Sequence, residues 1–198
     1  MKTLHIALVL LMTASMPSLV RAENIQAALI GYQEVPSVST PGNGEFHAKI
    51  ARDGTSITYE LTFGDLIGTV QQSHIHFAQR SVNGSVVVWL CQTVTTPAPP
   101  TVAAITPFCP QSGTVTGTIT AANVVTASTT SQQIVAGELA EVIAAIRAGV
   151  AYVNVHSTPL NPGGEIRGQI RGSEDRDRDG DHDGRDRDDH DHDHDHGR

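Results

Sequence analysis

The most constraining feature of this chain is a strict alternation of apolar and polar side chains on both sides of an Asp-Gly pair. Residues 46–50 alternate before the pair, and residues 57–63 resume the alternation after it. A period of two places successive side chains on opposite faces of a β-strand, so each segment has one apolar face. Asp53 and Gly54 accept the positive φ angles that a tight turn requires. The pattern therefore predicts an antiparallel hairpin with one buried face.

Other segments between turn signals have the same strand character, with one exception. Strands are predicted over residues 24–30, 45–50, 56–63, 70–78, 85–90, 113–120, 150–156 and 165–171, the last one following a turn at Asn161–Gly164. The exception spans about residues 138–148, where Leu139, Val142 and Ile146 fall on one helical face. We expect an all-β domain, an immunoglobulin-like or Greek-key sandwich or barrel with one short helix.

The first 22 residues are predicted to be a signal peptide. Lys2 precedes an apolar run over residues 4–14, and residues 20–22 fit a small-residue cleavage site. The run is too short to span a bilayer, and an uncleaved anchor is the alternative. No other segment is long and apolar enough to cross a membrane. The chain is therefore expected to be exported, either to the periplasm or out of the cell.

The chain has two cysteines, Cys91 and Cys109. In an oxidising compartment a disulfide is the default, and free thiols or metal ligands are the alternative. The stretch between the cysteines contains four prolines, so we expect it to form a loop that the disulfide closes.

The remainder divides into a domain over residues 23–172 and a tail over residues 173–198. The tail has no hydrophobic residue and carries twelve acidic residues against five arginines. Such a segment cannot offset the entropy of ordering, so it is expected to be disordered. Most of the chain's net charge of -8 lies in the tail. No basic patch exists, which argues against nucleic acid as a partner.

Three segments of the domain match a known family pattern. They are residues 28–36 (ALIGYQEVP), residues 73–78 (SHIHFA), and residues 147–170, which include AYVNVHS and NPGGEIRGQI. Together they resemble the CHRD domain, a family named after the repeats of chordin and common in exported bacterial proteins. The resemblance covers nearly all of residues 24–171. It implies an all-β, immunoglobulin-like barrel, in agreement with the strand pattern, and it implies little about activity.

Histidines in two predicted strands point to metal binding. His74 and His76 leave the same strand face, and His156 ends another strand. If these strands are neighbours, three imidazoles converge, and imidazole suits Cu and Zn. In the alternative, these side chains hydrogen-bond the backbone at a sheet end. His47 is a possible fourth ligand, although its charged neighbours on the same face predict exposure to solvent.

The tail offers metal ligands that need no fold. His190, His192, His194 and His196 alternate with aspartates, and such a tract binds divalent transition metals such as Cu, Ni and Zn. The alternative is a tail that only keeps the protein soluble. Residues 175–186 match several positions of an EF-hand calcium loop but lack its flanking helices, so we expect at most loose Ca²⁺ association.

The leading functional hypothesis is an exported CHRD-type binding protein that captures divalent metal ions. One alternative is an extracellular module that binds a protein or polysaccharide, and another is a Cu-dependent enzyme resembling superoxide dismutase. No catalytic residues are predicted, since the sequence contains no nucleophile elbow, phosphate-binding glycine loop or Cys-x-x-Cys motif.

Overall fold

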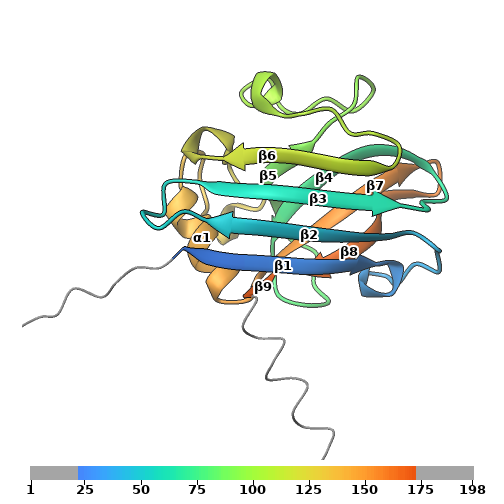
Figure 1. The fold of residues 1–198 in the computed structure, drawn as a ribbon, viewed down its shortest axis with the longest axis horizontal. Helices are drawn as coiled ribbons and strands as arrows, with labels where there is room; N and C mark the ends of the chain where they lie inside the picture. Colours follow the sequence, from blue (N-terminus) through green and yellow to red (C-terminus); the bar gives the residue numbers. More distant parts are fainter. Residues whose placement is uncertain (1–21, 173–198) are drawn as a thin grey trace, which may run out of the picture.

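The computed structural model describes residues 22–172, which form a β-rich domain with one α-helix (Figure 1). The strands are β1 (Glu23–Ile30), β2 (Asn43–Ile50), β3 (Ile57–Gly64), β4 (Thr69–Phe77), β5 (Ser85–Cys91), β6 (Gly113–Ile119), β7 (Ala151–Thr158), β8 (Asn161–Gln169) and β9 (Arg171–Gly172). The helices are α1 (Leu139–Arg147) and the short 3-10 helices η1 (Gly31–Gln33), η2 (Ala103–Ile105), η3 (Ala121–Asn123) and η4 (Thr130–Gln132). The predicted all-β class with one short helix is confirmed.

The strands form a single antiparallel sheet that curls into a nearly closed barrel (Figure 1). The strand order is β5-β4-β7-β8-β1-β2-β3-β6, and β9 pairs with β1. The sheet folds back on itself so far that strands near its two ends meet. The Tyr59 hydroxyl of β3 donates a 2.7 Å hydrogen bond to the Leu90 carbonyl of β5. The apolar side chains that face inward form one continuous core. Of the architectures that the sequence allowed, the chain adopts the barrel.

The hairpin predicted from the alternating pattern is confirmed as β2 and β3. The two strands pair over their full length, from Asn43 opposite Gly64 to Ile50 opposite Ile57. Buried and exposed residues alternate along both strands. In the turn Gly54 has a φ of 69°, which a side chain would strain. The period-two pattern therefore predicted both the pairing and the buried face.

The predicted helix is also confirmed, and it covers one end of the barrel. Its buried side chains are Leu139, Val142, Ile143, Ala145 and Ile146. These residues recur at helical spacing, so α1 adds one apolar stripe to the core. Within residues 22–172, no helix has the length and apolar character that a membrane crossing requires.

The turn predicted at Asn161–Gly164 is wrong. The chain reverses at Pro159–Leu160, and β8 begins with the Asn-Pro-Gly-Gly segment itself. Glycine is needed here for space, because a Cβ on Gly164 would lie 2.2 Å from the Oε1 atom of Glu34. The φ of Gly164 is 132°, a conformation that other residues rarely adopt. A glycine required for close packing was thus interpreted as a turn signal.

The predicted disulfide is present between Cys91 and Cys109. It joins the end of β5 to a loop that contains η2 and is organised by Gln92. The buried Gln92 side chain accepts a hydrogen bond from the Ala98 amide and donates to the carbonyls of Ala103 and Thr106. The loop is therefore tied to the barrel both covalently and by buried hydrogen bonds.

Replacing both cysteines with alanine is expected to lower the free energy of unfolding by about 3 kcal/mol, because the bond closes a loop between residues 18 apart. Urea unfolding of the two proteins measures the difference. Reduced wild-type protein serves as the control and should show a similar loss. Equal stability of oxidised wild type and the double variant would show that the loop is held without the disulfide.

Candidate metal site

Three histidines lie on the outer face of the barrel, on the neighbouring strands β4 and β7. His76 is opposite Tyr152 and His74 is opposite Asn154, while His156 lies opposite Gln72 in the same strand pair. The residues between them, such as Ile75 on β4 and Val153 and Val155 on β7, point into the core. The two histidine strands are therefore neighbours, which is the condition for convergence of the imidazoles, and the three imidazoles share the face opposite to the core.

Although these histidines are outside the barrel, they are buried. The exposed fractions are 2% for His74, 7% for His76 and 6% for His156. A covering loop, residues 78–84 between β4 and β5, contacts the cluster at His76. His76 Nδ1 donates a hydrogen bond to the Gly84 carbonyl of this loop. The site is therefore shielded from solvent although it lies on the outer face of the sheet.

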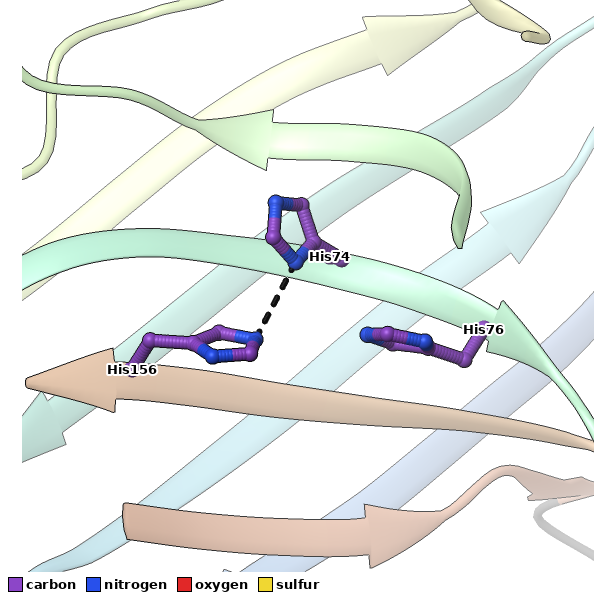
Figure 2. A group of neighbouring side chains, drawn as sticks. All are labelled: His74, His76 and His156. Carbon is purple, nitrogen blue, oxygen red and sulfur yellow. Dashed lines mark hydrogen bonds between the residues drawn. The ribbon is translucent and has the colours of Figure 1, made fainter. Parts of the chain in front are cut away.

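The three rings converge on one small space. Figure 2 shows His76 and His156 with a ring nitrogen of each directed toward the other, and His74 directed toward the same gap. His74 Nδ1 lies 3.1 Å from His156 Nε2, and one nitrogen from each of the three residues lies within 4.8 Å of the others. Ligands about 2 Å from a common tetrahedral ion are about 3.3 Å apart. The most widely separated nitrogens therefore need to close by at most about 1.5 Å to share such an ion.

The hydrogen bonds determine which nitrogens carry protons. His76 Nδ1 is 2.9 Å from the Gly84 carbonyl, and His156 Nδ1 is 2.9 Å from the Pro162 carbonyl. A carbonyl oxygen only accepts, so both Nδ1 atoms donate and both Nε2 atoms of the neutral rings have a free lone pair. His74 Nδ1 must then donate to His156 Nε2. Histidines held through one nitrogen by a backbone carbonyl are the usual arrangement in metal sites.

Electrostatics keep the three rings in the form that binds metal. Burial lowers the pKa of His76 to about 4 and also lowers the pKa of His156. The pKa of His74 is well below its usual range, because of burial and then of the two neighbouring histidines. Only a neutral imidazole is a ligand. The site is therefore competent to bind metal at neutral pH without first releasing protons.

Aromatic and charged residues surround the cluster. The Tyr152 ring stacks on His76 with ring centroids 4.6 Å apart, and the Arg167 guanidinium lies 3.4 Å from the centroid of Tyr152 on its other side. Trp89 meets His74 edge to face at 4.2 Å. Arg167 also donates hydrogen bonds to the covering loop, at the Val82 carbonyl and the Asn83 side chain. One buried cation thus fixes both the loop and the ring stack under it.

Some residues of this neighbourhood were not identified from the sequence. Neither Asn154 nor Arg167 was among the candidate site residues. The buried carboxyl of Glu34 follows η1 in the chain and no local pattern indicates its position. Burial raises its pKa to about 7, against the opposing charge of Arg167. Such residues are brought together only by the fold, so no spacing rule could have found them.

The structure also places the weaker candidate ligand. His47 lies on β2, away from the cluster, with half of its side chain exposed and a 3.1 Å contact to Glu45. Its predicted exposure is confirmed, and it is not part of this site. The tail histidines His190, His192, His194 and His196, the aspartate-rich residues 175–186 and the predicted signal peptide lie outside the described residues.

The comparisons with known proteins agree with the resemblance noted in the sequence. No curated protein and no solved structure matches this chain. The CHRD domain family matches residues 25–170, which run from the third residue of β1 past the end of β8 and include all three clustered histidines. Because the match covers most of the chain and coincides with the barrel, this chain belongs to the CHRD domain family.

Proposed function

We propose that this chain is an exported CHRD-domain protein that binds a divalent transition metal, Cu²⁺ or Zn²⁺, at His74, His76 and His156. One observation carries the proposal: three buried, neutral imidazoles direct nitrogens into one space, and carbonyl groups fix the orientation of two of them. A proton between His74 and His156 now occupies the place of a cation. Binding of a metal ion to all three rings would move that proton from Nδ1 to Nε2 of His74, so that the ring stays neutral and Nδ1 becomes its ligand atom.

The proposal also covers where the protein is located and what its C-terminal tail, residues 173–198, contributes. The disulfide supports an oxidising compartment, either the periplasm or the extracellular space. The alternating Asp-His tract of the tail would add weaker, multiple metal sites and could deliver ions locally. The domain would act by binding, without catalysis. An extracellular module that binds protein or polysaccharide remains the rival, and it predicts no metal site within the barrel.

Calorimetric titration of the mature chain with Zn²⁺ and Cu²⁺ tests the proposal. The tail variant replaces His182, His190, His192, His194 and His196 with asparagine, so that no histidine remains in the tail. We expect this variant to bind one ion per chain, and to melt at a higher temperature with metal, because an ion that binds only the folded state stabilises it.

Two further substitutions in the tail variant locate the site. His76→Phe keeps a ring to stack on Tyr152 but removes a ligand, and it should abolish the stoichiometric binding. His47→Asn is the matched control, since it removes an exposed histidine of the same domain and should leave binding intact. If the tail variant binds no ion, or if His76→Phe binds as well as its parent, the domain is not a metal site.

A further inference from the structure

Asn154 lies in the centre of the candidate site. It is the residue of β7 between Tyr152 and His156 on the site face, and 2% of its surface is exposed. Its Oδ1 atom is 3.0 Å from His156 Nε2. The Asn154 side chain also lies beside His76, where it opposes the lowering of the pKa of that ring. It therefore lies next to two of the three proposed ligands, in the space where their nitrogens meet.

The contact between Asn154 and His156 brings two acceptors together. His156 Nδ1 donates to the Pro162 carbonyl, so Nε2 has only a lone pair. An amide oxygen has no proton to donate either. The one nearby donor, His74 Nδ1, is directed at His156 Nε2. Two acceptors 3.0 Å apart repel each other unless a positive charge lies beside both. A metal ion that bonds to both atoms supplies that charge, and the two atoms then form one edge of its coordination polyhedron.

The orientation of the Asn154 amide is set from its other side. A Cβ on Gly164 would lie 2.8 Å from Asn154 Nδ2 and 2.2 Å from Glu34 Oε1, so these groups meet over Gly164. The Asn154 side chain lies beside the Glu34 carboxyl and favours its ionised form, which lowers the pKa of Glu34. When Glu34 is ionised its oxygens can only accept hydrogen bonds, so an amide turned the other way would put its oxygen against two acceptors. Glu34 therefore acts as a positioning residue that directs Oδ1 toward the histidines.

We propose that Asn154 Oδ1 is the fourth ligand of the ion, which is then enclosed by three imidazole nitrogens and one amide oxygen. This inference rests on the proposed function and specifies its chemistry. Four protein ligands leave no open position, which is typical of structural rather than catalytic zinc sites. A hard amide oxygen disfavours Cu⁺, which prefers soft sulfur ligands. The site is therefore specific for a tetrahedral divalent ion, with Zn²⁺ preferred over Cu⁺.

Zn²⁺ affinity in the full-length tail variant tests the fourth ligand. Asn154→Leu removes the oxygen at similar volume and should weaken Zn²⁺ binding by roughly 100-fold. Loss of a residue that only orients a ligand weakens metal binding by about 10- to 100-fold, so a ligand should reach or exceed the upper end of that range. Asn154→Asp keeps an oxygen donor at the same place and should bind within about tenfold of its parent. Melting of both variants in chelator shows that they are folded. Binding by Asn154→Leu as tight as by the parent would overturn the proposal.

Cobalt provides a readout that a merely structural role would not change. With Co²⁺ in the site, the parent should show the intense visible bands of four-coordinate cobalt, and added azide should leave them unaltered because no position is open. Co²⁺ in Asn154→Leu should bind azide and change its bands. A parent spectrum that changes with azide would show that the ion has an open position. The proposed fourth ligand would then be wrong, while the proposed metal site would not be contradicted. If His76→Phe binds Co²⁺ like its parent, both proposals fail.

Discussion

The metal-free protein is expected to lose stability steeply when the pH falls from about 6.5 to about 4. The pKa of His76 is lowered to about 4 by burial, from an unfolded value of 6.5. Between these values the unfolded chain binds a proton that the folded protein excludes, so acid favours unfolding. His76 alone contributes roughly 3 kcal/mol, and the lowered pKa values of His74 and His156 act in the same direction.

Urea unfolding in the presence of a chelator measures this loss. The chain has a single tryptophan, Trp89, which contacts His74 and therefore reports on the site itself. The free energy of unfolding should fall continuously from pH 6.5 to pH 4.5, a window chosen to lie above the titration of ordinary carboxyls. His76→Phe should reduce the slope of the free energy of unfolding against pH by the amount that corresponds to one proton. A wild-type curve that stays flat across this window would mean that the histidines are solvated.

The Glu34 carboxyl changes the free energy of unfolding with pH in the direction opposite to the histidines, and a substitution separates its effect from theirs. Its folded pKa is about 7 against 4.5 unfolded, so between these values the folded protein holds a proton that the unfolded chain has released. Stability therefore falls as the pH rises through this window, by roughly 3 kcal/mol in total. Glu34→Gln removes this contribution. The variant should be more stable than wild type near pH 7, and its loss of stability on acidification should be steeper.

The parts of the fold that follow from local pattern were predictable. Alternation specified the β2–β3 hairpin, and helical spacing specified α1, because each pattern reflects burial of one face of one element. The disulfide required only two cysteines and an oxidising compartment. For the same reason the histidine pair of β4 was recognised as sharing a face. What could not be derived is that β7 lies beside β4, since that pairing joins strands about eighty residues apart.

The surroundings of the site depend on contacts that no spacing rule contains. Glu34 reaches Asn154 and Gly164 from a segment more than a hundred residues away in the chain. Arg167 fixes the covering loop from β8. A Pro-Gly-Gly sequence is a strong turn signal, yet here the second glycine serves close packing. Sequence pattern thus identified the candidate ligands but not the residues that surround and orient them.

Gly164→Ala is expected to destabilise the protein by roughly 2–4 kcal/mol, which combines overpacking with a strained backbone. The new Cβ would lie 2.2 Å from Glu34 Oε1 and 2.8 Å from Asn154 Nδ2, and the φ of 132° is unfavourable for alanine. The side chains that must move are the proposed fourth ligand, Asn154, and Glu34, which orients it. Zn²⁺ binding should therefore weaken together with stability, although every histidine is intact.

The adjacent glycine provides a matched control. A Cβ on Gly163 meets nothing within 4 Å, so Gly163→Ala should change stability by less than about 0.5 kcal/mol and leave Zn²⁺ binding unaltered. Urea unfolding and calorimetry on both variants make the comparison. Combining Gly164→Ala with Glu34→Ala removes the nearest collision, so the double variant should be less destabilised than the sum of the single effects. Additive effects would show that Glu34 does not pack against Gly164, and the orientation of Asn154 would then need another cause.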